Sequence, residues 1–356
     1  MIQVDSSPGV LSHYVFTDST GAEYRLDLND GNGIWWSKQG TYAVYDPGLH
    51  RIRFMDGTFW QMDSMAASTE PDKGTRYPTK VQDSNGNYIV IEYKPGAGQG
   101  GVNSSARIST IRDIRSSPGN AYTFTYNTDS PTPHLTGIAT SVPTGENYTL
   151  LYTAVVTLTS PFGGGQTVSA PLLQSLTATG PALVHNFEYG TNNAGELTKV
   201  IFPYKGEIRW AYQNSGLYSN GKMLREVQYR YLVKQLGATP TTYTFLWDAS
   251  SNPFHFWARV LDANGVSEKR YYYGFGAGDT TTPYAGLVLY QQEYIQGTSN
   301  IPRSTQFFWA TDAHGNPYIG KTEAQLDPLQ TYLKMIKTEQ QLDIYGHYCP
   351  KRLRAT

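Results

Sequence analysis

The chain has 356 residues, enough for one large domain or two ordinary ones with a sizeable core. Charged residues make up 16%, and 28 Lys plus Arg stand against 29 Asp plus Glu. No basic excess is available to hold a phosphate backbone, so nucleic acid is excluded as an expected partner. The single cysteine, Cys349, excludes an internal disulfide framework and a multi-cysteine metal site.

The N-terminal residues lack the basic start and apolar run of a signal peptide. No uninterrupted apolar stretch approaches the length of a transmembrane helix, so we expect no membrane span. These residues do not assign a compartment.

The first part of the chain, residues 1–65, is rich in tryptophan and the least regular. Its short β-prone segments are separated by Asp30-Gly-Asn-Gly33, Asp46-Pro-Gly48 and Asp56-Gly57, which are typical of turns. We predict an irregular, Trp-rich β region over residues 1–65, followed by one continuous repeat array over residues 66–356.

A degenerate unit recurs along the chain, in which a turn signal is followed by alternating large apolar residues. One copy is Asp83-Ser-Asn-Gly86-Asn-Tyr88, which continues through Ile89 and Ile91 to Tyr93. This pattern predicts an all-β fold of stacked antiparallel hairpins. We expect the following aromatic residues to form the core of the repeats: Tyr88, Tyr93, Tyr122, Tyr126, Tyr148, Tyr152, Trp210, Tyr212, Trp247, Tyr271 and Tyr273.

Particular hairpins can be predicted from this pattern. Residues 80–82 and 88–93 pair across Asn85-Gly86, whose preference for positive φ suits a two-residue type I′ turn. The other predicted pairs are 107–112 with 122–126, 134–140 with 148–152, 173–176 with 184–189, 197–202 with 207–212, 224–232 with 242–247, 258–261 with 269–273, and 287–294 with 305–309.

Helical patterns are nearly absent. The best helix candidate is residues 324–342, but Pro328 interrupts it and β-prone residues follow, so we favour a non-helical structure there.

Catalytic and metal-binding motifs are not found. The seven histidines are scattered, with none three or four residues from another, so we interpret them as structural or surface residues. The segment Asp27-Leu-Asn-Asp30-Gly31 misses the spacing of a calcium loop and is interpreted as a turn. The sequence contains no nucleophile elbow, phosphate loop or dinucleotide fingerprint. We therefore predict no enzyme, no catalytic residue, no metal and no cofactor.

Four acidic residues among the predicted strands leave a glycoside-active enzyme as a distant alternative. Glu188, Glu207, Glu226 and Asp248 could form a carboxylate pair only through the fold. We interpret them as solvent-facing, which is usual for acids on strands.

The tryptophans divide into two groups. Trp210 and Trp247 alternate with Ile208 and Phe245, which indicates packing within the sheet. Trp35 and Trp36 are adjacent, and successive side chains of a strand point to opposite faces. The pair Trp35 and Trp36 is therefore our candidate contact surface, for a ligand or for another part of a larger assembly.

Several strings resemble the YD repeat of Rhs proteins, which also occurs in teneurins and insecticidal toxin-complex shells. They are Val81-Gln-Asp83-Ser-Asn-Gly86-Asn-Tyr88, Leu261-Asp-Ala-Asn-Gly265 and Leu342-Asp-Ile-Tyr-Gly346. The resemblance covers most of the chain from Arg51 onward and rests on repetition, because each motif alone is a common turn. It implies a spiral shell of stacked hairpins with aromatic residues packed in rows.

In that family, such shells enclose a C-terminal toxic domain or act as surface adhesion modules. The family's C-terminal core region and effector domain have no counterpart here, so we expect a fragment of a larger shell. The resemblance implies a non-enzymatic shell segment, extracellular or on a bacterial surface, that associates through strand edges with itself or other segments. A toxin domain or a surface glycan is a further expected partner. The alternative function is a carbohydrate-binding or adhesive cell-surface module.

Overall fold

The structure, a computed structural model, describes residues 1–7, 10–38, 42–115, 121–127, 133–142, 145–217, 223–248, 255–263, 265–274, 286–312, 315–327, 334–342 and 348–350. These residues form strands and turns and contain no helix, which confirms the predicted all-β class. Two compact units can be separated. Unit 1 comprises Met1–Thr149, Ala178–Ala182 and Tyr345–His347, and unit 2 comprises Leu150–Thr177, Leu183–Ile344 and Tyr348–Thr356.

Unit 1 contains fifteen strands and the beginning of a sixteenth. They are β1 (Ile2–Ser7), β2 (Val10–Thr17), β3 (Glu23–Leu26), β4 (Leu28–Asn29), β5 (Trp35–Trp36), β6 (Ala43–Asp46), β7 (Arg51–Phe54), β8 (Phe59–Gln61), β9 (Ser64–Met65), β10 (Arg76–Tyr77), β11 (Lys80–Gln82), β12 (Tyr88–Tyr93), β13 (Ile108–Asp113), β14 (Ala121–Tyr126), β15 (Leu135–Thr140) and β16 (Tyr148–Tyr152).

Two sheets build unit 1. A five-stranded sheet has the order β3-β2-β1-β10-β9, and the other runs from β4 through β8 to β11 and on to β16. A core of seven buried side chains from β1, β2, β3, β6, β7 and the residue after β8 joins the two sheets: Ile2, Phe16, Leu26, Ala43, Tyr45, Ile52 and Met62. This core lies within residues 1–65, where the irregular Trp-rich region is predicted.

Unit 2 contains the remaining strands. They are β17 (Val156–Thr159), β18 (Thr167–Ala170), β19 (Leu173–Ala178), β20 (Leu183–Tyr189), β21 (Leu197–Ile201), β22 (Glu207–Leu217), β23 (Met223–Val233), β24 (Thr241–Trp247), β25 (Trp257–Leu261), β26 (Ser267–Tyr273), β27 (Val288–Ile295), β28 (Arg303–Thr311), β29 (Pro317–Leu326), β30 (Lys334–Leu342) and β31 (Tyr348–Pro350).

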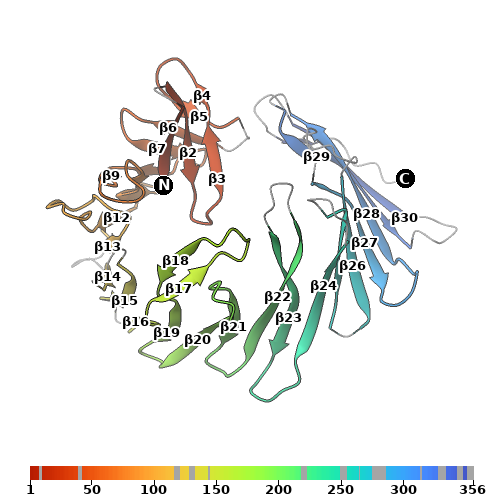
Figure 1. Cartoon of the computed structure of the whole chain (residues 1–356). Coiled ribbons are helices and arrows are strands. Elements are labelled where there is room, and N and C mark those ends of the chain that lie inside the picture. Colours follow the sequence, from red (N-terminus) through yellow and green to blue (C-terminus); the bar gives the residue numbers. More distant parts are fainter. Residues whose placement is uncertain are drawn as a thin grey trace. The chain divides into compact units, whose positions relative to one another are not determined.

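The strands of unit 2 pair in sequence order. From β20 to β30 each strand lies between its chain neighbours, and the neighbouring strands are antiparallel. Strands β17 and β18 form a separate two-stranded sheet, drawn beside β19 to β21 in Figure 1. Among the buried apolar side chains of the described residues, only Val233 belongs to this unit. Unit 2 is therefore a sheet in which most side chains on both faces are half-buried.

The predicted hairpin pairs are confirmed, including β11 with β12, β13 with β14, β15 with β16 and β25 with β26. The helix candidate at residues 324–342 ends β29 and contains β30, and these two strands pair with each other. Residues 328–333 between them, including Pro328, lie outside the described part.

The type I′ turn predicted at Asn85-Gly86 is wrong. The Asp83 amide donates to the Asn87 carbonyl oxygen at 2.9 Å, so three residues rather than two separate the bonded ends. Only Gly86 has a positive φ, of 86°, whereas a type I′ turn needs two such residues. The Asp83 carboxylate explains the difference, because it accepts hydrogen bonds from the Asn85 and Asn87 amides and fixes a type I turn followed by one left-handed residue.

Candidate functional site

A carboxylate-held turn recurs between paired strands, and we call it the aspartate turn. In four copies the aspartate Oδ1 accepts the amide four residues later, at 2.8–3.1 Å, and the residue three positions on is glycine with φ between 82° and 90°. The aspartate amide donates to the carbonyl of that same fourth residue. The four aspartates are Asp18, Asp30, Asp83 and Asp312.

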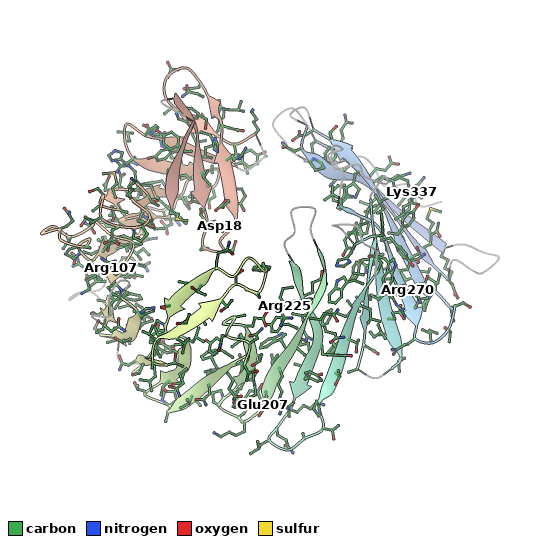
Figure 2. The ribbon with its side chains drawn as sticks, viewed as in Figure 1. Asp18, Arg107, Glu207, Arg225, Arg270 and Lys337 are labelled. Carbon is green, nitrogen blue, oxygen red and sulfur yellow. The ribbon has the colours of Figure 1, made fainter. Side chains whose placement is uncertain are left out.

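These hydrogen bonds favour the ionised carboxylate. The bond from the Asn87 side chain, followed by those from the backbone, lowers the pKa of Asp83. The bond from the Thr20 hydroxyl has the largest share in lowering the pKa of Asp18, which is labelled in Figure 2. An ionised carboxylate is the better acceptor, so each turn is held most firmly when its aspartate is charged.

A second recurring feature is an aromatic residue at a register shift. Where the last strand of one hairpin pairs with the first strand of the next, the register shifts by one residue directly before an aromatic side chain. This happens between β12 and β13, β14 and β15, β20 and β21, β22 and β23, β26 and β27, and β28 and β29. We call these six residues the bulge aromatics: Tyr93, Tyr126, Tyr189, Tyr212, Tyr273 and Trp309.

Four of the bulge aromatics bind back across their own hairpin. The hydroxyl of Tyr93 donates to the Pro78 carbonyl at 2.9 Å, and that of Tyr189 donates to the Leu173 carbonyl at 2.9 Å. The other two bonds are from the Tyr212 hydroxyl to the Leu197 carbonyl, at 2.7 Å, and from Trp309 Nε1 to the Val288 carbonyl, at 2.9 Å. Each acceptor lies at or just before the start of the hairpin's first strand, so the aromatic side chain spans two strands. We call each bond a clamp.

Burial raises the pKa of all five bulge tyrosines, so their hydroxyls stay protonated and able to donate. Four of the six bulge aromatics are among the repeat-core aromatics predicted from the sequence, and Tyr189 and Trp309 are not. Spacing was the available signal, because a clamp donor follows its acceptor by 15, 16, 15 or 21 residues, which is the length of one hairpin.

The other predicted repeat-core aromatics are spread over several hairpins and are not brought together in one site. Lys80 Nζ lies 4.0 Å from the centroid of the Tyr88 ring. Tyr122 is 37% exposed, and Trp247 stacks against His255 with ring centroids 5.8 Å apart. The remaining members are half-buried: Tyr148, Tyr152, Trp210 and Tyr271.

Trp35 and Trp36 have different surroundings. The ring of Trp35 packs edge-on against Tyr14, with centroids 5.4 Å apart, and contacts the unit 1 core. The side chain of Trp36 is 41% exposed. Only Trp36 is therefore open to a ligand in this structure.

Charged side chains of unit 2 join neighbouring strands. Glu268 is 2% exposed, and its two carboxylate oxygens accept hydrogen bonds from Arg259 at 2.6 and 2.8 Å. Arg270, labelled in Figure 2, also donates to Glu268 and lies over the Tyr294 ring. Burial alone would raise the pKa of Glu268, but the bonds from Arg259 and Arg270 outweigh it and bring the pKa below its usual value.

The four acids considered for glycoside chemistry have partners. Glu188 pairs with Lys199 at 2.7 Å, and Glu207 pairs with Arg209 at 2.5 Å. The solvent-facing interpretation is wrong for Glu207, which is 6% exposed, because Arg209 supplies the countercharge that burial requires.

The solvent-facing interpretation is also wrong for Glu226 and Asp248, whose side chains are 18% and 10% exposed because both meet His255. We expected His255 to be a structural or surface residue. His255 Nε2 lies 2.6 Å from Glu226 Oε1, and Nδ1 lies 3.4 Å from Asp248 Oδ1. The three residues come from β23, the end of β24 and the start of β25. Their contact links three successive strands of the sheet.

The described residues contain no group of three or more His, Cys, Asp or Glu side chains placed to hold a metal ion. Within the same residues no helix has the length and apolarity that a membrane-spanning segment needs.

Comparison with solved structures gives matches of low TM-score. The crystal structure of TcdB2-TccC3-TEV matches 98% of this chain at 11% identity and TM-score 0.27, and that of TcdB2-TccC3 matches 94% at 12% identity and TM-score 0.26. The structure of the Photorhabdus luminescens Tc holotoxin pore matches 98% at 12% identity and TM-score 0.21. The chain spans 17 to 22% of the length of those chains. TM-scores at this level leave function to be argued from this chain's own residues.

No family model matches this chain, and no curated protein matches it.

Proposed function

We propose that this chain is a non-enzymatic structural segment of a larger Rhs-type shell, in which successive hairpins form a surface that encloses or presents a partner polypeptide. The observation that carries the proposal is the repetition of one bulge aromatic on six hairpins. A unit repeated in this way builds an extended surface by adding copies side by side.

The contacts of the repeated residues support a structural role. A clamp tyrosine donates its hydroxyl hydrogen to a carbonyl oxygen of its own hairpin. Its ring is buried in Tyr93 and half-buried in Tyr189 and Tyr212. Its hydroxyl group is therefore hydrogen-bonded within the sheet and is not available to bind a substrate. A hydrogen bond of this kind contributes about 0.5–1.5 kcal/mol, so several clamps together stabilise a sheet that has little apolar core.

The resemblance to Rhs repeats supports a further proposal about where this chain acts and which polypeptides it binds. In this proposal the chain works outside the cell or at a bacterial surface, and it associates with other shell segments and with a toxin domain.

A reporter experiment tests the enclosing role. An unfolded reporter polypeptide is fused after Thr356, and its cleavage by a protease is compared with that of the free reporter. We expect the fused reporter to survive about tenfold longer, because a folded shell limits access to the open chain. The variant Tyr93→Phe with Tyr189→Phe and Tyr212→Phe, checked for folding by circular dichroism, should lose part of this protection. Equal cleavage of fused and free reporter would contradict the proposal.

A carbohydrate-binding or adhesive module is the second candidate, and the observation that favours it is the 41% exposure of Trp36. Exposed aromatic rings suit stacking against sugars. Glycan-array binding that is lost with Trp36→Ala and kept with Tyr122→Ala, a matched exposed aromatic of unit 1, would place this function above the shell.

A further inference from the structure

The hairpin of β17 and β18 lies in a long stretch of the chain that carries no charged residue. Residues 147–187, which include this hairpin, are 41 consecutive positions without Asp, Glu, Lys or Arg. The two strands form their own two-stranded sheet, and most of their side chains are exposed. An isolated two-stranded hairpin is marginally stable in water, so this element gains from a further strand.

The register gives the hairpin one apolar and one polar face. Val156 pairs with Ala170 and Leu158 with Val168, which places these four side chains on one face. Thr157, Ser169, Thr159 and Thr167 make up the other face by the same register. On the apolar face Val168 is 62% exposed and Val156 is 36% exposed.

Backbone bonding shows which groups point out of the hairpin. The Ser160 amide donates to the Gln166 carbonyl at 2.9 Å, and bonded pairs recur at every second residue of an antiparallel ladder. The pairs Leu158–Val168 and Val156–Ala170 are therefore bonded within the hairpin. It follows that the amides and carbonyls of Thr167 and Ser169 point outward along β18.

The two edges of the hairpin differ in whether their outward backbone groups are hydrogen-bonded. On the β17 edge the outward amide of Thr159 donates to the Asn193 carbonyl at 2.7 Å. On the β18 edge, within the described residues, no further strand pairs with Thr167 or Ser169. Proteins usually protect an open edge with a charge, a proline or a bulge, and residues 167–170 (Thr-Val-Ser-Ala) contain neither charge nor proline.

We propose that β18 is a docking edge for a second copy of this chain, whose β18 adds antiparallel to it. The fit follows from the register. A two-fold axis at Val168 sets Thr167 opposite the partner's Ser169 and Ser169 opposite the partner's Thr167. All the outward amides and carbonyls of these residues then meet in hydrogen-bonded pairs.

The side chains also fit in this arrangement. Val168 faces the partner's Val168 as a non-hydrogen-bonded pair, the closer of the two cross-strand arrangements. Two apolar faces join into one face of a four-stranded sheet. The uncharged segment adds no repulsion between like copies, and the net charge of each chain is only −1. This inference does not depend on the proposed function.

Symmetric disulfide trapping tests the docking edge, because it captures even a weak complex. In a Cys349→Ser background, Val168→Cys places two sulfurs at the two-fold axis, where the Cα and Cβ separations suit a disulfide. Thr167→Cys is the matched control. It is also exposed, but in the proposed register two copies of residue 167 are about 8 Å apart, beyond disulfide reach.

We expect Val168→Cys to form covalent dimer about tenfold faster than Thr167→Cys at equal concentration, with a rate that falls on dilution. Adding Ser169→Pro removes one outward amide without touching a bond to β17, and should reduce trapping to the level of the control. Thr157→Pro, which removes an outward amide of the opposite edge, should leave trapping unchanged. Equal trapping of Val168→Cys and Thr167→Cys, or trapping that survives Ser169→Pro, would overturn the proposal.

Discussion

In unit 1, two sheets close over seven buried side chains, whereas from β19 to β30 of unit 2 the described residues include a single buried apolar side chain, Val233. Unit 1 has the ordinary means of stability, the removal of apolar surface from water. Unit 2 relies on contacts between neighbouring strands, which are the clamps, the ion pairs around buried glutamates and the ring contacts. We infer that unit 1 is stabilised mainly by its buried core and unit 2 mainly by contacts between neighbouring strands. Single substitutions in each unit test this difference.

The largest expected effect is the loss of a core side chain from unit 1. Ile52 is fully buried, so Ile52→Ala should lower the free energy of unfolding by about 2–5 kcal/mol through lost burial and a cavity. Ile208 on β22 is half-buried, and Ile208→Ala should cost roughly 1 kcal/mol because less surface returns to water. Denaturant titration of both variants measures the contrast. A larger loss in the free energy of unfolding for Ile208→Ala than for Ile52→Ala would contradict the proposed difference between the units.

Neutralising Glu268, the most buried carboxylate among the described residues of unit 2, should have the next largest effect. Glu268→Gln leaves Arg259 and Arg270 without their countercharge and should destabilise the protein by about 1–3 kcal/mol. The matched control is Lys269→Gln on the same strand, whose ion pair with Glu293 is long, at 3.9 Å, and more exposed. Its cost should stay within about 0.5 kcal/mol. Equal unfolding midpoints for both variants would show that Glu268 does not hold the strands together.

The loss of one clamp should be smaller. Tyr212→Phe keeps the ring and removes the bond to the Leu197 carbonyl, at a cost of about 0.5–1.5 kcal/mol. Tyr122→Phe is the control, since Tyr122 is 37% exposed and lies outside the clamp positions. In thermal unfolding, Tyr212→Phe should have the lower melting temperature of the two variants. Identical melting temperatures would contradict a stabilising role for the clamp.

The smallest effect is a local response to acid at an aspartate turn. The pKa of Asp83 is lowered, chiefly by the Asn87 side chain, so the ionised form stabilises the folded turn. That contribution is fully present above the unfolded-state pKa of about 3.9 and is lost as the pH falls through the lower folded value. Amide exchange at Asn85 and Asn87 should therefore quicken in acid. Asp83→Asn should abolish this acid dependence, and an unchanged profile in that variant would contradict the assignment.

The strand pairs could be predicted because each hairpin carries its own signal, an Asp or Gly turn followed by alternating residues such as Ile89, Ile91 and Tyr93. The turn at Asn85-Gly86 was assigned to the wrong type because the dipeptide was considered without the carboxylate of Asp83. An aspartate before the dipeptide was the available signal, because aspartate side chains often bond to the backbone amide two residues later.

Contacts between hairpins could not be predicted from the sequence. Nothing in the spacing of Glu226, Asp248 and His255 shows that three strand ends meet, since the contact depends on register. The same holds for Glu268, whose burial depends on Arg259 of the neighbouring strand β25 and on Arg270 of its own strand β26. The uncharged stretch that carries β17 and β18 was visible in the sequence, but its open edge requires the observed pairing.

Hydrogen exchange of the full chain, with and without Tyr212→Phe, tests the central claim that clamps hold the hairpins of unit 2 side by side. The account predicts faster exchange in β21, β22 and β23 and unchanged exchange in β5 to β8 of unit 1. Unchanged exchange around Tyr212, or an increase spread evenly over both units, would contradict it.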